Sequence, residues 1–258
     1  MSAADHDGRQ CPTSYPTPPS RTRWAALLVL GLLVTRVWGA PPGPPWPSFL
    51  PPPESFPPDV AAAVERTWND LTFTRTVAGR PARAPFDLYA ALIDAPDVTA
   101  AAARFRRFAP HEVRALGEDW YEADDGDGSR GQYRVLVREP RRRVMLSWGE
   151  HSSGLIGGIR GSALTVLALK PRGAEIDQDL TAHVRIDNRV AAALARVLMV
   201  PFGRLADRRL REGFESAARV AEWAVERPEE FCQWLGRAPV PPDRRTPVLA
   251  ALGGCGAQ

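Results

Sequence analysis

Apolar and polar residues alternate along the middle of the chain, and this period of two predicts β-strands. Strands are predicted at residues 71–77, 111–122, 132–138, 144–148, 162–170 and 176–186. In the third stretch Tyr133, Val135 and Val137 share one predicted face. Turn residues recur about every dozen residues between the stretches, which is typical of an antiparallel meander.

Other stretches repeat their apolar residues at helical spacing. Short helices are predicted at residues 60–68, 86–92 and 100–108, the first capped by Asp59. A longer helix is predicted from residue 189 to about residue 227, with Pro201 kinking or dividing it. Its apolar stripe runs through Phe202, Ala206, Leu210, Phe214, Ala217, Ala221 and Val225. Such a stripe is expected to lie on the open face of the sheet.

The N-terminal residues indicate export. Residues 1–23 are polar and predicted to be disordered. Residues 24–39 follow Arg21 and Arg23 and hold an apolar run shorter than the about 20 residues that a membrane-spanning helix needs. Val37 and Gly39 provide small residues for a cut before Ala40. The segment is therefore interpreted as a cleaved signal peptide or, alternatively, a short uncleaved anchor.

A proline-rich linker is predicted at residues 40–58 because proline excludes helix and sheet and favours polyproline II. It is expected to be a stiff spacer of roughly 55 Å. The alternative is a ligand for a proline-binding module, with Trp46, Phe49 and Phe56 interleaved. One domain is predicted at residues 59–235, followed by a disordered tail at 236–258.

Charge and cysteine content narrow the function classes. The net charge of the chain is +3, and much of it lies before residue 40, so the near-neutral body argues against nucleic-acid binding. Cys232 and Cys255 either form a disulfide in an oxidising compartment or remain two thiols. No Cys/His spacing resembles a zinc site, and no cofactor is predicted.

The order of predicted elements resembles a known superfamily. The segments that carry the resemblance are Leu71–Val77, Phe86–Phe108, Glu112–Ile186 and Val190–Val225. This order is similar to the helix-grip fold of the START, polyketide cyclase and Bet v 1-like (SRPBCC) superfamily, including its uncharacterised bacterial members. The resemblance implies an α+β fold in which a curved antiparallel sheet wraps around a long C-terminal helix. It also implies an apolar cavity between them.

The residues expected to line that cavity come from the alternating strands and the long helix. They are Tyr133, Val135, Leu146, Trp148, Leu180, Val184, Leu210 and Phe214, with Glu150 orienting a polar group at the mouth. The alternative is that these side chains simply fill the core, since protein interiors are close-packed.

Few residues indicate catalysis or metal binding. The acidic turn Asp125–Ser129 fails as a calcium loop at Arg130 and Leu136, so it is interpreted as a hairpin turn. His151 follows Glu150, but no nucleophile elbow accompanies it. His183 is interpreted as a surface histidine on a solvated strand face.

Two further segments have alternative readings. Residues 154–158 are interpreted either as a loop that gates a cavity or as a loose turn. The basic residues 141–143 are interpreted as a solvated hairpin end or as a contact with anionic lipid heads.

The sequence thus favours a noncatalytic role: binding or carriage of an apolar, lipid-like small molecule by a periplasmic, extracellular or membrane-anchored domain. A membrane surface is the other expected partner. The alternatives are a cyclase- or hydrolase-type enzyme that uses Glu150 and His151 in the same cavity, and a structural or interaction domain with a filled core.

Overall fold

The computed structural model describes residues 44–153 and 157–255, and at residues 153, 157, 194 and 196–210 it describes the backbone alone. The chain divides into the units Met1–Pro42 and Gly43–Gln258, and every element below belongs to the second. The helices are η1 (Pro53–Ser55), α1 (Pro58–Asn69), α2 (Phe86–Asp94), α3 (Pro96–Phe105), α4 (Arg189–Glu226), α5 (Pro228–Arg237) and α6 (Pro242–Ala251). The strands are β1 (Phe73–Ala78), β2 (Glu112–Ala115), β3 (Trp120–Asp124), β4 (Ser129–Glu139), β5 (Arg142–Ser153), β6 (Gly157–Arg172) and β7 (Glu175–Ile186).

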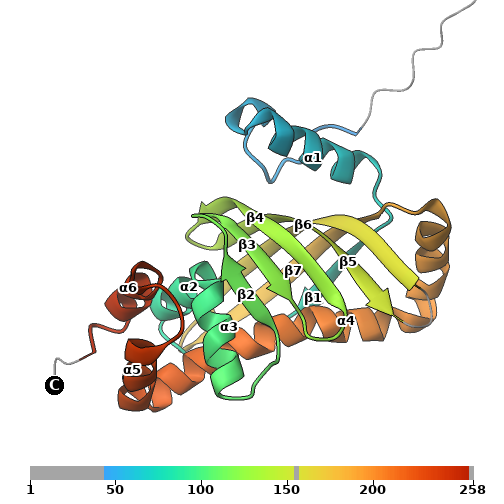
Figure 1. Cartoon of the computed structure of the whole chain (residues 1–258). Coiled ribbons are helices and arrows are strands. Elements are labelled where there is room, and N and C mark those ends of the chain that lie inside the picture. The colour runs from blue at the N-terminus through green and yellow to red at the C-terminus, as the bar shows by residue number, and fades with distance from the viewer. Residues whose placement is uncertain (1–43, 154–156, 256–258) are drawn as a thin grey trace, which may run out of the picture. The chain divides into compact units, whose positions relative to one another are not determined.

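The seven strands form one curved, open, antiparallel sheet in the order β1-β7-β6-β5-β4-β3-β2 (Figure 1). This confirms the predicted α+β class and the antiparallel meander. Two tight hairpins need backbone with positive φ, which glycine adopts without strain. Gly126 and Gly128 have φ values of 74° and 94° between β3 and β4, and Gly173 has 63° between β6 and β7.

The predicted strand at 111–122 is in fact two strands. The chain reverses between β2 and β3, where the amides of Leu116 and Gly117 both donate to the carbonyl of Trp120. Alternation continues across this tight turn, so the pattern alone did not reveal the reversal.

A β-bulge breaks the predicted face of β4. Val135 pairs with Met145 and Val137 pairs with Val144, so Leu136 is the extra residue. A bulge inserts one residue and moves the following side chains to the opposite face. Tyr133 and Val135 therefore share a face that Val137 does not, contrary to the sequence prediction.

One face of the sheet, here called the core face, packs against helices. Leu167, Leu169, Leu180 and Ala182 of β6 and β7 lie in one buried cluster with residues of α2, α3 and α4. Among them are Leu88 and Leu92 of α2 and Ala217, Ala218 and Ala221 of α4. The C-terminal part of the long helix thus contacts the sheet through small side chains, at β1 and β7.

The opposite face, here called the α1 face, carries a second buried cluster. Leu50, Val64, Val137, Val144, Leu146 and Leu164 form it. Trp46, Phe49 and Phe56 pack around it, and the indole N–H of Trp68 donates to the carbonyl of Pro45 at 2.9 Å. From Trp46 on, the predicted linker is therefore folded onto the domain, because its interleaved aromatic residues bury apolar surface there.

The C-terminal residues are ordered helix rather than the predicted disordered tail. Phe231 and Leu235 of α5 and Val248 of α6 are fully buried in the main cluster. Cys232 and Cys255 form a disulfide with their Cα atoms 5.5 Å apart, so the first of the two cysteine alternatives holds.

A buried ion pair joins α2 to β5 of the sheet. Arg143, only 6% exposed, donates to both carboxylate oxygens of Asp94 at 2.6 and 2.7 Å. Arg138 also reaches Asp94, at 2.6 Å. Arg143 therefore points into the protein and is not part of a basic hairpin end.

No helix among residues 44–153 and 157–255 is long and apolar enough to cross a membrane. The predicted export segment at 24–39, the extension at 1–23 and residues 154–156 of the glycine-rich loop lie outside the described residues.

Candidate functional site

A pocket of about 490 Å³ opens on the core face of the sheet, and strands β3 to β7 all contribute to its lining. Its side chains come from alternate positions of five strands. They are Ala123, Ser129, Tyr133, Ser147, His151, Ile159, Ala163, Val184 and Ile186. This volume lies within the range of small-molecule sites, about 300–1,000 Å³. We call it the core-face pocket.

Three glycines form the floor of the core-face pocket. Gly131, Gly149 and Gly161 are paired neighbours on β4, β5 and β6. A Cβ atom on Gly131 or Gly161 would lie 2.5 Å from a backbone oxygen of the adjacent strand, and one on Gly149 would also collide with backbone. Glycine is thus required where the backbones of these strands approach closely, and the same absence of side chains leaves the pocket open.

The polar end of the pocket is built around Ser129 and His151, which face each other across β4 and β5. The Ser129 hydroxyl and Nδ1 of His151 lie 3.0 Å apart. Asp125 accepts from the backbone amide of Ser129 at 2.9 Å and from that of Asp127 at 2.7 Å. Burial acts to raise the pKa of Asp125, but these hydrogen bonds and one from the Ser129 hydroxyl outweigh it, so the pKa lies below its ordinary value. The Asp125 carboxylate therefore stays ionised and places a negative charge next to the Ser129–His151 pair.

Tyr133 forms a wall of the same pocket. Its ring stacks on Tyr121 with centroids 5.1 Å apart. Burial, together with the neighbouring Tyr121, raises the pKa of the Tyr133 phenol far above its ordinary value, so the hydroxyl stays protonated. The pocket thus combines apolar walls with a few neutral or paired polar groups.

The nine residues predicted to line one cavity do not lie together. Tyr133 and Val184 line the core-face pocket. Leu180 and Phe214 belong to the packed core, and Val135 shares their face of the sheet. The side chain of Leu210 lies outside the described residues.

Leu146, Trp148 and Glu150 lie on the α1 face instead. Tyr133 pairs with Ser147, and Gln132 pairs with Trp148, so the even-numbered residues of this part of β5 face away from Tyr133. Glu150 pairs with Arg160 at 3.2 Å on that face, whereas His151 faces the core-face pocket. The Glu150–His151 arrangement expected for an enzyme is therefore absent, since adjacent strand residues point to opposite faces.

His183 is not the solvated histidine that the sequence predicted. It lies under the N-terminal segment, stacked on Phe49 with centroids 5.3 Å apart and edge-on to Trp68 at 5.0 Å. Burial lowers its pKa below the ordinary value for histidine.

Ser129, Ile159 and Ile186 line the core-face pocket but were not predicted from the sequence to do so. Ser129 is two positions before Gly131 and four before Tyr133, so alternation along β4 was a usable signal for it. Ile159 follows the glycine-rich loop, which was not predicted to be strand, and Ile186 ends the last predicted strand.

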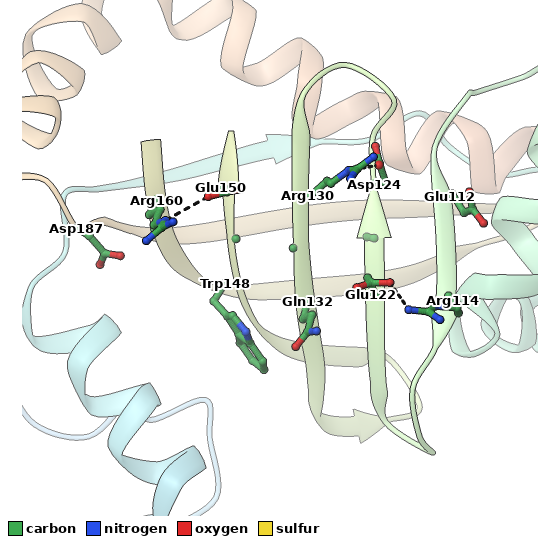
Figure 2. Close-up of a pocket in the computed structure, with 14 residues that line it drawn as sticks. Glu112, Arg114, Glu122, Asp124, Arg130, Gln132, Trp148, Glu150, Arg160 and Asp187 are labelled. Carbon is green, nitrogen blue, oxygen red and sulfur yellow. Dashed lines mark hydrogen bonds and ion pairs between the residues drawn. The ribbon is translucent and has the colours of Figure 1, made fainter. Parts of the chain in front are cut away.

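The α1 face carries a polar pocket of about 840 Å³. Figure 2 shows its charged side chains on neighbouring strands, many of them in cross-strand ion pairs. Arg114 pairs with Glu122 at 2.6 Å, and Arg130 pairs with Asp124 at 2.5 Å. Across residues 44–153 and 157–255, no group of three or more His, Cys, Asp or Glu side chains is placed to hold a metal ion.

No protein-family model matches the chain, and no curated protein matches it. Solved structures do resemble the domain. A conserved protein from Geobacillus kaustophilus is 16% identical, with a TM-score of 0.42 over 58% of this chain and 97% of its own. An uncharacterised protein from Rhizobium leguminosarum is 14% identical, with a TM-score of 0.39 over 58% and 94%. A protein from Arthrobacter aurescens is 12% identical, with a TM-score of 0.39 over 58% and 87%.

Proposed function

We propose that the core-face pocket binds an apolar small molecule that carries one polar group. The observation that carries the proposal is the composition of the pocket: Tyr133, Ile159, Val184 and Ile186 supply apolar walls, and Ser129 with His151 supplies a hydrogen-bonding end. Largely apolar pockets with a few well-placed polar groups are the usual form of small-molecule sites.

In this proposal the domain is a helix grip of the SRPBCC type, with the sheet wrapped around α4. The strand order and the contacts of α4 with β1 and β7 support that part. The proposal also places the domain outside the cytoplasm or on a membrane anchor. The Cys232–Cys255 disulfide agrees with an oxidising compartment, where such bonds persist.

Binding can be tested on the full chain with decanoic acid as the probe, by titration calorimetry. Ala163 lines the core-face pocket, whereas Ala168 pairs with Asp179 on the α1 face of the same strand. Ala163→Leu is expected to lower the affinity more than tenfold by filling the pocket, and the matched control Ala168→Leu is expected to leave it unchanged.

Native mass spectrometry of the purified chain checks the same proposal without a chosen probe. A co-purifying lipid-like mass that Ala163→Leu removes is the expected result. Spectra without such a mass, together with no measurable decanoic acid binding, would rule out the pocket as a ligand site.

A further inference from the structure

A second, separate groove of about 590 Å³ lies on the α1 face, between α1 and strands β3, β4 and β5. One wall is α1, anchored where the hydroxyls of Thr67 and Ser162 lie 2.8 Å apart. The floor includes Gln132, Leu146 and Ser162. The groove adjoins the polar pocket of Figure 2, with which it shares Gln132 and Trp148. We call it the α1-side groove.

Two tryptophans expose their indole rings in this groove. Trp120 is 42% exposed and Trp148 is 38% exposed. Trp120 pairs with Arg134 and Trp148 with Gln132, so β4 alone separates the two strands that carry them. Two strand spacings correspond to about 10 Å across the sheet. Exposed large apolar side chains that face a groove, rather than scattered singly, mark a binding surface.

Between the two indoles lie hydrogen-bond donors without partners. Within the described part of the chain, no hydrogen bond or ion pair engages the guanidinium of Arg134 or the amide of Gln132. Two of the nearby carboxylates are already paired, Glu122 with Arg114 and Asp187 with Arg185, whereas Asp59 on the α1 wall has no ion pair among the described residues. The free groups at the centre of the groove therefore favour a ligand rich in acceptor oxygens.

The charge balance of the residues that line the groove narrows the chemical class of that ligand. The lining of the groove and the adjoining pocket holds six carboxylates and six guanidinium groups. A polyanion such as a nucleic-acid strand needs a clear excess of positive charge, because phosphate neutralisation dominates its binding. A ligand with isolated carboxylates needs only one arginine for each, and Arg134 is placed to form such a bidentate pair.

We propose that the α1-side groove binds an acidic oligosaccharide, meaning a short chain of sugar rings in which isolated rings carry a carboxylate. One side of a sugar ring presents C–H groups with partial positive charge, which suits the negative face of an indole. Two rings stack on Trp120 and Trp148, and a carboxylate between them accepts hydrogen bonds from Arg134. The Gln132 amide donates to a neighbouring hydroxyl. This site is distinct from the core-face pocket and does not depend on its ligand.

The test compares a trisaccharide whose central ring alone is a uronic acid with the methyl ester of that trisaccharide, which has the same rings but a blocked carboxylate. Titration calorimetry on the full chain is expected to show at least tenfold tighter binding of the acid. In the wild-type protein, two of the eight tryptophan indole N–H signals are expected to shift in NMR spectra on titration. Assignment through Trp120→Phe and Trp148→Phe is expected to identify these two signals.

Matched variants separate stacking from charge. Trp148→Ala is expected to weaken binding of acid and ester alike by about tenfold. Arg134→Gln is expected to weaken the acid about tenfold and leave the ester unchanged. Arg83→Gln is the charge control, because Arg83 is 76% exposed and pairs with Glu175 away from the groove. Unchanged unfolding midpoints confirm that each variant folds.

Several results would overturn the proposal: equal affinity for acid and ester, no binding of either, shifts confined to other tryptophans, or tighter binding of a single-stranded oligonucleotide. Ala163→Leu distinguishes the two proposed sites. It is expected to leave binding of the acidic trisaccharide unchanged even where it abolishes binding of decanoic acid.

Discussion

Arg244 reaches from α6 to a carboxylate that the protein has buried. Asp97 at the start of α3 is only 3% exposed, and Arg244 donates to its two oxygens at 3.0 and 3.1 Å. The same guanidinium donates to the hydroxyl of Tyr121 at 2.8 Å. Because Tyr121 stacks on Tyr133, this arginine supports a wall of the core-face pocket from behind.

Arg244→Gln is expected to destabilise the protein by about 3–5 kcal/mol, since it leaves the Asp97 carboxylate buried without a charged partner. Urea unfolding measures the loss. Arg83→Gln breaks an exposed pair and is expected to cost less than about 1 kcal/mol. Recovery of part of the loss in Asp97→Asn/Arg244→Gln would confirm the pairing, whereas additive losses would contradict it.

His183 makes stability depend on pH. Burial lowers its pKa in the folded protein, and burial together with Arg104 lowers that of His111, so the unfolded chain binds protons more readily. Stability is therefore expected to fall as pH decreases through the ordinary histidine pKa of about 6.5, toward the lower folded value. Urea midpoints between about pH 7.5 and pH 5 check this. His183→Asn is expected to flatten the decline, and an unchanged slope would exclude His183 as a cause.

At the scale of elements, β5 contributes side chains to both faces of the sheet. Ser147, Gly149 and His151 face the core-face pocket, while Trp148 and Glu150 face the α1 side. Alternation along one strand is a local property, so the sequence revealed which residues of β5 share a face. The register between β4 and β5 decides which residues of the two strands share a face. The predicted register was wrong by one residue.

The bulge after Val135 was equally hidden. It inserts Leu136 within an otherwise regular apolar pattern, and nothing in the neighbouring residues marks it. The element types and their order follow from the periods of two and 3.6, which is why the fold class was predictable. Which residues line a pocket depends on pairings between distant segments, so the lining residues were not predictable from the sequence.

Gly149→Ala tests the close approach of the β4 and β5 backbones. A Cβ atom at this position would collide with the backbone of β4, so the strands must separate. The expected loss is about 1–3 kcal/mol, as for overpacking elsewhere, measured by urea unfolding. Gly117→Ala is the control, since its nearest contact would be an ordinary 4.0 Å to Trp120. Equal stability of the two variants would show that the strands do not need glycine at position 149.

At the scale of the whole domain, both ends of the described chain pack onto the sheet or its helices. The segment from Trp46 to Phe56 covers part of the α1 face, and α6 packs on the main core. These ends were predicted to be linker and tail because proline dominates the first segment and proline, arginine and glycine recur in the second. A few aromatic and branched residues hold these two ends on the domain, and the residues they contact lie far away in the sequence.

The Cys232–Cys255 disulfide closes the loop that contains α6, with a sequence separation of 23. Closing a loop of this length is expected to contribute about 3 kcal/mol by restricting the unfolded chain. Reduction, or Cys232→Ser/Cys255→Ser, is expected to lower the free energy of unfolding, measured by urea unfolding, by a similar amount. The double variant is expected to be insensitive to reductant, and a persisting response to reductant would argue against this bond as the stabilising contact.

The bare floor of the core-face pocket has a consequence for engineering. Gly131, Gly149 and Gly161 present only main chain there, and that main chain is already committed to the sheet ladder. Redesign of ligand preference is therefore confined to the rim, at positions such as Ile159 and Val184. The glycine floor would present the same surface without side chains to every ligand.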